Sequence, residues 1–562
     1  MFVCVFFQKK CLYLRRFWIK MIRRLIFTFV AVVAALGTKA QIYMSSEVQK
    51  FALVSYAIQS YYVDTINEKK MIEEAIKDML HNLDPHSMYI PAEEVQKMNE
   101  PLDGSFDGIG VQFQMMEDTL LVIQTISGGP SEKVGIRAGD RIVAVNDSSI
   151  AGKKVSTTDI QKKLRGKKGT SVEVKVLRRG VKDLISFKIV RDKIPIYSID
   201  AAYMVTPEIG YIKLNRFSAT TVDEYNEAYL KLKKQGVKSL ILDLQDNGGG
   251  YLSAAERLAN EYLPSGQLIV YTEGTNHPRQ TYISSAIGNF KEGNLVLLVD
   301  EGSASASEIL AGAVQDNDRG LIVGRRTFGK GLVQKPVPLP DGSMMRLTVA
   351  RYYTPSGRCI QRPYKDKGDD YNKDLIERYN HGELMHEDSI VFHDSLKYET
   401  KVLGRTVYGG GGVMPDIFVP IDTTLFTNYH RDLVAKGALN KFVLNYVEQN
   451  RKKLESKYSD KNGGFKRYLS DFAADSLMMN GLVEAGKAEK VDYNEEEFKK
   501  SKDLIALQLK AVIARDLWSV SEYYQIINQS NELYLKAVEL LQSPEAYRNG
   551  FKKNVKGKEK KK

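Results

Sequence analysis

Two loops of the chain carry residue types that together can perform nucleophilic catalysis. One contains three serines in alternation with alanines, Ser303, Ser305 and Ser307, and then Glu308. The other presents Lys330 between two glycines. A serine hydroxyl needs a base, and a lysine can act as one when burial lowers the pKa of its amine from about 10.4. The pair therefore indicates acyl transfer by a serine nucleophile.

The serine loop precedes a predicted helix over residues 309–314. Free N–H groups and the dipole at a helix start stabilise developing negative charge. The N–H of Ala306 and one from Gly249 or Gly250, which follow another predicted strand, are the candidates for an oxyanion hole. A structural alternative stands beside this, because Ser305 and the glutamate three positions later also match a capping box.

The lysine segment has a rival interpretation as a nucleotide site. Gly324, Gly329 and Lys330 match a phosphate-binding loop up to its last position, where Gly331 replaces the Ser or Thr that binds magnesium. Residues 332–337 then read as a strand, and no helix follows to receive phosphates. Nucleotide binding is therefore disfavoured.

Nothing in the histidines or cysteines resembles a metal site. Three of the seven histidines fall in a polar insertion over residues 366–395 at spacings that match no metal motif, and His81 and His86 are expected to cap or pack. Cys359 is the one cysteine beyond residue 40, so neither a disulfide framework nor a zinc cluster is predicted. We expect no metal and no cofactor.

The loops are positioned by an alternation of strands and helices from residue 194 to residue 420. Residues 239–243 and 295–300 are apolar enough to be buried parallel strands, and residues 321–324 form a third strand before the lysine loop. Parallel strands place their carboxyl ends at one edge of a sheet, where ligands collect. The glycine, serine and lysine loops should therefore meet there.

A compact mixed domain is predicted before this core, over residues 104–191, with short β-rich runs and one helix at residues 157–164. A glycine-containing loop stands directly before one of its strands. This loop consists of Gly108, Ile109, Gly110 and Val111. Its N–H groups are suited to a carboxylate, and the adjoining strand edge to an extended peptide. The loop is the candidate peptide-binding site.

The two ends of the chain carry its positive charge. Residues 1–40 hold eight basic residues and no acid, and residues 552–562 hold seven lysines against one glutamate, so the formal charge of +12 leaves the rest of the chain two charges negative. A basic groove for nucleic acid is not expected. The lysine-rich end is interpreted as a solvated tail, with peripheral attraction to anionic membranes as the alternative.

Residues 1–40 read as an export signal. Arg23 and Arg24 precede an apolar run over residues 25–36, and a small-residue site ends at Ala40. The run is shorter than the ~20 residues needed to span a bilayer, so cleavage before residue 41 is favoured over a membrane anchor. Met21 is an alternative start. A helical lead-in is predicted over residues 41–103 and a mainly helical C-terminal region over residues 421–562.

Several stretches, in order, resemble the carboxyl-terminal processing proteases, also called tail-specific proteases. They are residues 83–87, 108–111, 243–250, 302–308, 329–334, 353–358 and 404–416. The resemblance implies that the middle serine, Ser305, is the nucleophile, that Lys330 is its base and that Gln334 orients that lysine. It departs at Gln245, where the family has an arginine, so a salt bridge made by that arginine is expected to be absent.

The resemblance implies an α/β (α+β) multidomain fold. A helical N-terminal region, a PDZ-like domain over residues 104–191, a crotonase- or Clp-protease-like core over residues 192–420 and a helical C-terminal region follow one another. The implied function is that of a serine endopeptidase exported to the periplasm or envelope of a bacterium, which recognises protein substrates by their free C-terminal tails. An inert PDZ-containing scaffold is the alternative. The oligomeric state is open, with a homodimer as one option.

Overall fold

The computed structural model describes residues 45–116, 118–364 and 369–552. Residues up to Ile76 and residues from Lys77 onward are two separate units. The predicted export signal and the last ten residues of the lysine-rich end lie outside the described residues. Within those ranges, no helix combines the length and apolar character needed to cross a membrane.

The N-terminal region is helical, as predicted, except for one strand. Its helices are α2 (Ser46–Tyr61), α3 (Glu68–His81) and α4 (Ala92–Asp103). Pro85 follows the end of α3, and the chain then forms β1 (Met88–Ile90), which pairs antiparallel with β18 (Met344–Tyr353). Because β1 forms hydrogen bonds to a strand more than 250 residues away, no local pattern predicted it.

The predicted mixed domain is a small antiparallel sheet with one longer helix against it. The sheet has the order β3-β4-β5-β7-β8, with β6 on β5. These strands are β3 (Val111–Met116), β4 (Thr119–Thr125), β5 (Arg141–Val145), β6 (Ser148–Ser149), β7 (Ser171–Leu177) and β8 (Ile185–Val190). Two helices, α5 (Pro130–Lys133) and α6 (Thr157–Leu164), complete it, and β2 (Ser105–Gly108) pairs with β9 (Asp192–Pro195) where the chain enters and leaves.

The α/β core contains a second, mostly parallel sheet with the order β10-β11-β12-β15-β16-β21. Its strands are β10 (Ile199–Met204), β11 (Ile209–Leu214), β12 (Ser239–Asp243), β15 (Asn294–Val299), β16 (Leu321–Gly324) and β21 (Ile417–Phe418). From β11 to β21 the pairs are parallel, and only β10 runs antiparallel. The predicted strands 239–243 and 321–324 match β12 and β16 residue for residue.

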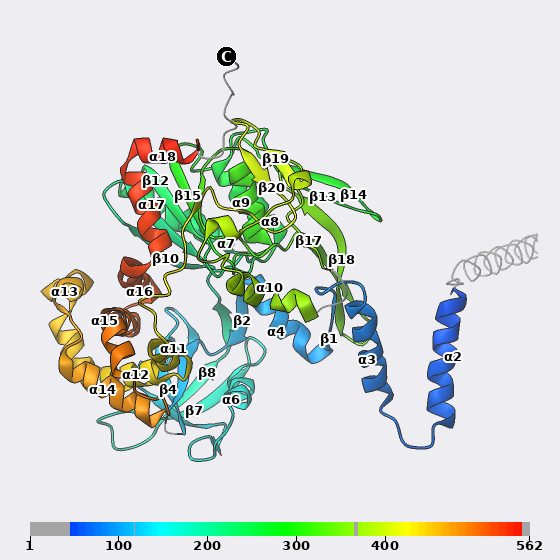
Figure 1. Ribbon diagram of the computed structural model, residues 1–562. Helices are drawn as coiled ribbons and strands as arrows, with labels where there is room; N and C mark the ends of the chain where they lie inside the picture. The colour runs from blue at the N-terminus through cyan, green and yellow to red at the C-terminus, as the bar shows by residue number, and fades with distance from the viewer. Residues whose placement is uncertain (1–44, 117, 365–368, 553–562) are drawn as a thin grey trace, which may run out of the picture. The chain divides into compact units, whose positions relative to one another are not determined.

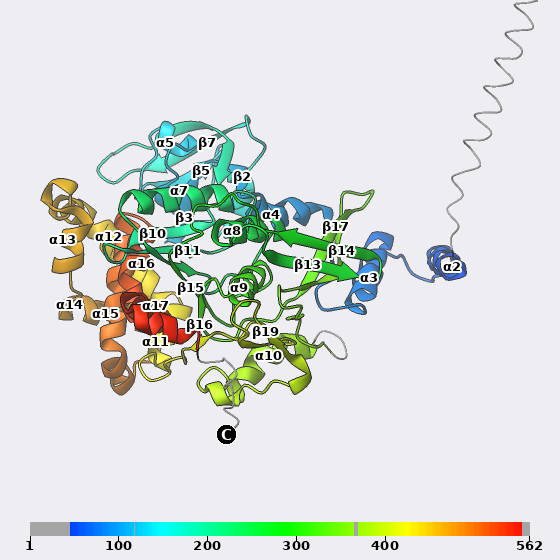
Figure 2. The ribbon, with the colours of Figure 1, turned by 90° about the horizontal axis from the view of Figure 1, so that it is seen from above.

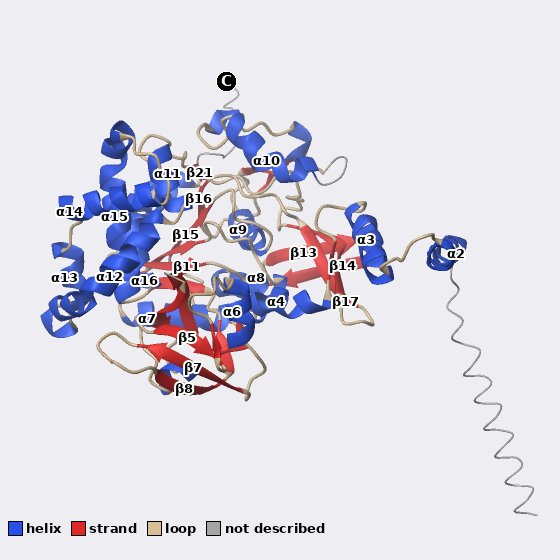
Figure 3. Cartoon of the chain, turned by 90° about the horizontal axis from the view of Figure 1, so that it is seen from below, coloured by secondary structure: helices blue, strands red, loops and turns tan. Residues whose placement is uncertain are grey.

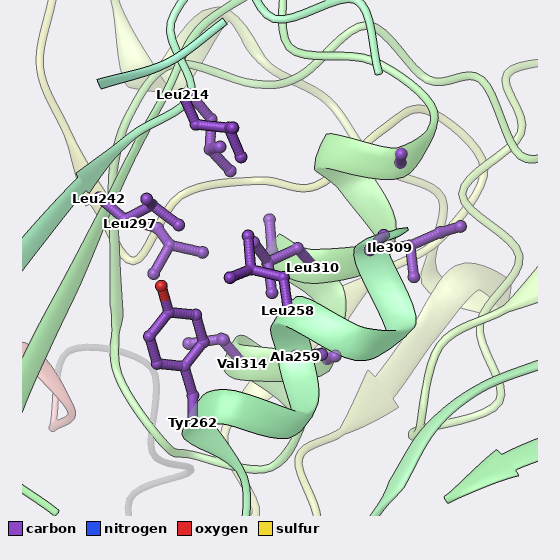
Figure 4. Close-up of a cluster of buried hydrophobic side chains, with 14 of the residues drawn as sticks. Leu214, Leu242, Leu258, Ala259, Tyr262, Leu297, Ile309, Leu310 and Val314 are labelled. Carbon is purple, nitrogen blue, oxygen red and sulfur yellow. The ribbon is translucent and has the colours of Figure 1, made fainter. Parts of the chain in front are cut away.

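Helices from two distant parts of the sequence cover the two faces of this sheet. On one face, Leu242 and Leu297 pack against Leu258 of α8 (Leu252–Tyr262) and Leu310 of α9 (Ala306–Asp316), as Figure 4 shows. The third helix on that face is α7 (Thr221–Lys234). Alternate residues of the same strands point the other way, against α17 (Glu532–Gln542) and α18 (Pro544–Gly550), drawn in red beside β12 and β15 in Figure 1.

A separate sheet extends from the core and carries the lysine segment. In it, β18 lies between β1 and β13 (Leu268–Gly274), β14 (His277–Ile283) pairs with β13, and β17 (Leu332–Pro338) pairs with β18. Figure 2 shows β13, β14 and β17 together beyond α8 and α9. The polar insertion follows β18 and contains α10 (Asp369–Asn380) and η1 (Glu387–Ser389), and it ends within η2 (Asp394–Leu396). The pair β19 (Lys397–Glu399) and β20 (Thr406–Tyr408) comes after it.

The C-terminal region is helical, as predicted, and has its own apolar cluster. Residues such as Leu439, Val443, Leu482, Leu509 and Ile513 are buried in that cluster. Most of its helices appear together on one side of Figure 3, and α16 lies beside the red strands of the core. They are α11 (Asn428–Ala435), α12 (Ala438–Lys457), η3 (Asp460–Asn462), α13 (Gly464–Asp471), α14 (Ser476–Ala488), α15 (Glu495–Leu517) and α16 (Val520–Ile527), and η4 (Asn528–Ser530) leads to α17.

Candidate active site

The loops that follow β12, β15 and β16 meet at one cavity of about 430 Å³. Because these three strands are parallel neighbours, their carboxyl ends share one edge of the sheet, as predicted. The cavity brings together the predicted catalytic and oxyanion-loop residues. Among its lining residues are Gly248, Gly249, Gly250, Ser305, Lys330 and Gln334.

Of the three serines in the loop, only Ser305 lines the cavity. The hydroxyl of Ser303 is fully buried and donates to the carbonyl oxygen of Leu244 at 2.8 Å, and that of Ser307 donates to the carbonyl oxygen of Asn247 at 2.8 Å. Ser305 has a positive φ of 55°, which is uncommon for a residue with a side chain. The hydroxyls of Ser303 and Ser307 are therefore bonded to backbone carbonyls, and only Ser305 faces the cavity.

Lys330 lies half-buried in the same cavity, and its Nζ donates to Oε1 of Gln334 at 3.2 Å. Burial lowers the pKa of Lys330, the positive charge of Arg346 lowers it further, and the acids Glu308 and Asp84 oppose the effect. Gln334 is held in turn, because its Nε2 donates to the carbonyl oxygen of His86. The amine therefore contacts an uncharged acceptor, which stabilises its protonated form less than a carboxylate would.

A buried carboxylate joins the serine loop to the lysine loop. Glu308 accepts hydrogen bonds from the backbone N–H groups of Ser305 (2.8 Å), Gly329 (2.7 Å) and Lys330 (2.9 Å), and from the hydroxyl of Thr327 (2.5 Å). Burial raises the pKa of Glu308 to about 7, although these donors act in the opposite direction. Its own N–H donates to the carbonyl oxygen of Ser305 at 2.9 Å. Glu308 therefore supplies the glutamate contact of the predicted capping box at the start of α9.

A tyrosine on β18 forms hydrogen bonds to both the serine loop and the lysine loop. The hydroxyl of Tyr352, on β18, contacts the carbonyl oxygen of Ser305 at 3.1 Å and that of Lys330 more closely. Its ring is 1% exposed, so this bridge is shielded from water. Sequence reasoning did not single out Tyr352 or Glu308 as links, because each depends on contacts between segments distant in sequence.

The oxyanion candidates differ in what their N–H groups already bind. Ala306 begins α9, so its N–H has no carbonyl within the helix to bond. The N–H of Gly249 is donated to Oδ1 of Asn247 at 2.9 Å, which makes it the poorer donor candidate. Gly249 instead provides close approach, since a Cβ there would lie 2.8 Å from Cβ of Ser305. Gly250 and Gly248 line the cavity beside it.

The turn after α3 supports the base, a role that the sequence did not reveal. Asp84 accepts from the N–H groups of His86 and Ser87, both at 2.8 Å, and from the hydroxyl of Thr348 at 3.1 Å on β18. This fixes the carbonyl oxygen of His86 that holds Gln334. Burial, together with the charge of Lys330, lowers the pKa of His86 to about 4. The prediction that His86 merely caps or packs omitted this contact.

A buried lysine pairs with the acidic residue two positions before Gln245. Lys213, on β11, is buried and donates to Oδ1 of Asp243 at 3.0 Å and to the carbonyl oxygen of Gln245 at 2.6 Å. The side chain of Gln245 donates to the other oxygen of Asp243 at 3.0 Å. Asp243 therefore pairs with a cation although residue 245 is a glutamine.

The predicted peptide-binding loop lies at the free edge of the small antiparallel sheet. Gly108 ends β2, Gly110 has φ of 72°, and Val111 begins β3, which is an edge strand. A shallow cavity of about 90 Å³ adjoins this loop and the C-terminal end of α6. Ile109, Gly110, Val111, Phe113 and Leu164 are among its lining residues.

No group of three or more metal-ligating side chains was found within residues 45–116, 118–364 and 369–552. The three histidines of the polar insertion therefore form no such cluster with their described neighbours. Cys359 is a free thiol, and burial raises its pKa.

Three family models match the chain. That of peptidase family S41 covers residues 208–366, that of the PDZ domain covers residues 108–189, and that of DUF8443, a family of unknown function, covers residues 429–519. The first two coincide with the core that carries Ser305 and Lys330 and with the small antiparallel domain.

Proteins with similar sequences carry consistent names. The carboxy-terminal processing protease CtpB of Bacillus subtilis is 34% identical over 308 residues, which is 54% of this chain and 64%, just under two thirds, of that protein. A carboxy-terminal-processing protease of Bartonella bacilliformis is 36% identical over 356 residues, 61% of this chain and 81% of that protein. The solved photosystem II D1 C-terminal processing protease is 31% identical, with 57% of this chain and 91% of that chain covered and a TM-score of 0.33.

Proposed function

The chain belongs to the family of carboxy-terminal processing proteases, and we propose that it is an active, exported endopeptidase with Ser305 as nucleophile and Lys330 as general base. One observation carries this proposal. Ser305 is the only one of the three serines in its loop that lines the cavity, and Lys330 lines the same cavity with its pKa lowered by burial. The other two hydroxyls are buried and bonded to backbone carbonyls.

The reaction proceeds through an acyl-enzyme. Oγ of Ser305 attacks the peptide carbonyl while neutral Lys330 accepts the hydroxyl proton. The N–H of Ala306 and one from the glycine loop of residues 248–250 stabilise the oxyanion that develops. Lys330 then returns the proton to the leaving amine, and water releases the acyl group by the reverse sequence.

Gln334, Glu308 and Tyr352 position the reacting groups. Gln334 orients the amine of Lys330 through its Oε1. Glu308 and Tyr352 each contact both the Ser305 and the Lys330 backbone, so they hold nucleophile and base in one geometry. Because a misplacement of about 1 Å can cost a hundredfold in rate, such links affect turnover directly.

Substrate selection is proposed for the PDZ domain. The N–H groups of residues 109–111 receive the terminal carboxylate of a tail, and the free edge of β3 takes the tail by β-augmentation. Protein substrates with free C-terminal tails are therefore the proposed partners, in the periplasm or envelope of a bacterium. Nucleic acid is not among them, since the chain from residue 41 to residue 551 is close to neutral.

The alternative is an inert scaffold of the cell envelope that binds tails and does not cut them. Gln245 was the residue that favoured it, because it replaces an arginine beside the glycine loop. A cation is nevertheless present beside Gln245, since Lys213 pairs with Asp243.

Cleavage of a tailed reporter by purified residues 41–562 tests the proposal. The wild type should cleave it, and Ser305→Ala should lose about a thousandfold or more of the rate. A lost cap costs only about 1 kcal/mol, so the variant should still fold. Ser456→Ala, at an exposed residue of α12, serves as the control on fold and rate. A well-folded Ser305→Ala within about tenfold of wild type would transfer the role to another serine, and an inactive wild type would favour the scaffold.

A further inference from the structure

Arg346 places a positive charge in the catalytic cavity, and its guanidinium forms few bonds to other protein groups. Its side chain is half-buried and lines the cavity together with Ser305 and Lys330. One of its terminal nitrogens donates to Oδ1 of Asn99 at 3.1 Å. Among residues 45–116, 118–364 and 369–552, no carboxylate forms an ion pair with it. Most of the five donors of the guanidinium therefore remain available to a ligand.

Other poorly exposed arginines of the chain are used differently. Arg358 pairs with Asp316 at 2.7 Å, and Arg405 pairs with Asp318 at 2.7 Å. Arg319 donates instead to three backbone carbonyls at 2.9 Å each. Arg346 is set apart from these by a single neutral acceptor and by its position in the cavity.

The strand register places Arg346 beside the catalytic machinery. It lies opposite Pro336 in the β17–β18 pair, and Gln334 lies opposite Thr348 two residues further along. Residues two apart share one face of a strand, so Arg346 is a diagonal neighbour of the glutamine that holds Lys330. The guanidinium is therefore close to the site where the peptide bond would be cut.

We propose that Arg346 binds a carboxylate of the substrate near the scissile bond, so that the enzyme prefers an acidic residue or a free chain end at that position. A guanidinium forms two parallel hydrogen bonds to a carboxylate, and such charge-assisted bonds are stronger than neutral ones. A bound carboxylate would also supply the countercharge that the protein itself omits. The inference deepens the proposed protease function and rests on it.

Two sources can supply that carboxylate, and paired peptides separate them. In the first series, the C-terminus is amidated, and Glu or Gln is placed in turn at each position flanking the cleavage site. In the second, Gln peptides end shortly after the cleavage site with either a free or an amidated terminus. Rates are measured as kcat/KM for wild type, Arg346→Gln and Arg346→Lys.

The wild type should prefer Glu over Gln at one position, or the free end over the amide, by about tenfold. Arg346→Gln should bring that ratio close to one, and Arg346→Lys should retain part of it. Ratios within one variant cancel any general loss of activity. A preference for a free terminus that persists in Arg346→Gln belongs to the PDZ domain. The proposal is overturned if wild type shows no carboxylate preference, or if the whole preference survives in Arg346→Gln.

Binding to Ser305→Ala keeps this test independent of catalysis. Fluorescence anisotropy of the labelled Glu and Gln peptides should give the same order of affinities in Ser305→Ala, and equal affinities in the double variant with Arg346→Gln. If wild type cuts nothing but the affinity ratio holds, the protease proposal fails and the role of Arg346 stands. If peptides are cut without any such ratio in rate or affinity, the role of Arg346 fails alone.

Discussion

Lys330 must lose its proton to act as a base, and its neighbours act on that equilibrium in opposite directions. Burial and the positive charge of Arg346 lower the pKa of its amine, whereas Glu308 and Asp84 raise it. We therefore expect kcat/KM to rise with pH as the neutral amine becomes populated, with a midpoint below the pKa of an ordinary lysine.

Replacing Arg346 tests the sign of this balance. Arg346→Gln removes a charge that disfavours the ammonium form, so the pKa of Lys330 should rise and the midpoint of the pH–rate profile should move to higher pH. Activity at neutral pH should fall accordingly. Arg346→Lys keeps the charge and should leave the midpoint close to that of wild type. A midpoint that stays in place or moves to lower pH in Arg346→Gln would contradict this account of the base.

At this scale, the reactive groups could be predicted from the sequence but their supports could not. Ser305, Lys330 and Gln334 stand in short motifs, so residue types and spacing were sufficient to nominate them. Glu308 could be recognised only as a capping residue, because its contact with Gly329 reaches the loop after a different strand, β16. Tyr352 could not be recognised, because it lies on β18 and no local pattern connects it with Lys330. The same holds for Lys213, which pairs with Asp243 from a different strand.

Helix α10 of the polar insertion contacts the backbone that leads into the lysine loop. Arg378 of α10 donates to the carbonyl oxygens of Arg326 (2.6 Å) and Thr327 (3.2 Å). The hydroxyl of Tyr371 lies 2.9 Å from Nε2 of His86, the residue whose carbonyl holds Gln334. The insertion thus supports the base from outside the motif-bearing part of the chain.

Removing one hydroxyl from α10 should therefore slow catalysis. In Tyr371→Phe, the His86 turn loses a hydrogen bond, so Gln334 should hold Lys330 less firmly. We expect kcat to fall about fivefold, the equivalent of a hydrogen bond of about 1 kcal/mol, with KM little changed. Tyr364→Phe is the matched control, because its ring lies 6.4 Å from that of Tyr371 and its hydroxyl forms no hydrogen bond to another residue within the described ranges. Equal effects of the two substitutions, or an effect on KM alone, would rule out the positioning role.

Regular elements with strong local patterns were the ones that the sequence predicted well. β12, β16 and α6 match their predicted bounds, since a continuous apolar run or a capping residue marks each of them locally. Helix α9 begins three residues before its predicted start, at Ala306 directly after the nucleophile. The strand β1 was not predicted, because its extended conformation depends on pairing with β18 and not on a local sequence pattern.

Across the whole chain from Lys77 onward, the C-terminal helices belong to two different packing units. Leu533 and Tyr534 of α17 pack on the core sheet, against Ile241 and Val296, so the core is completed by residues far beyond position 420. Leu444 of α12 instead packs against Met116, Leu121 and Ile123 of the PDZ domain. The helical region thus contacts the domain proposed to read substrate tails.

The apolar contact between α12 and the PDZ domain involves few side chains, so a single introduced charge should disrupt it. Leu444→Glu places a carboxylate among three apolar side chains and near Glu448, which bonds Arg141 of the PDZ domain at 3.1 Å. We expect the contact to weaken by about 2 kcal/mol or more. Hydrogen exchange of the β3 and β4 amides should then accelerate, while exchange in β12 and β15 stays slow. The control Leu477→Glu, at an 81% exposed residue of α14, should change neither. Unchanged exchange in β3 and β4 would mean that this contact does not hold the PDZ domain.

The central claim is that Ser305, activated by Lys330, is the nucleophile, and covalent labelling tests it most directly. The protein is treated with a serine-reactive phosphonate ester that carries an apolar side chain, and the modified residue is located by peptide mapping with mass spectrometry. We predict a single adduct on Ser305, with a labelling rate reduced about a hundredfold or more in Lys330→Met. An adduct on Ser303 or Ser307, or an undiminished rate in a well-folded Lys330→Met, would contradict the account.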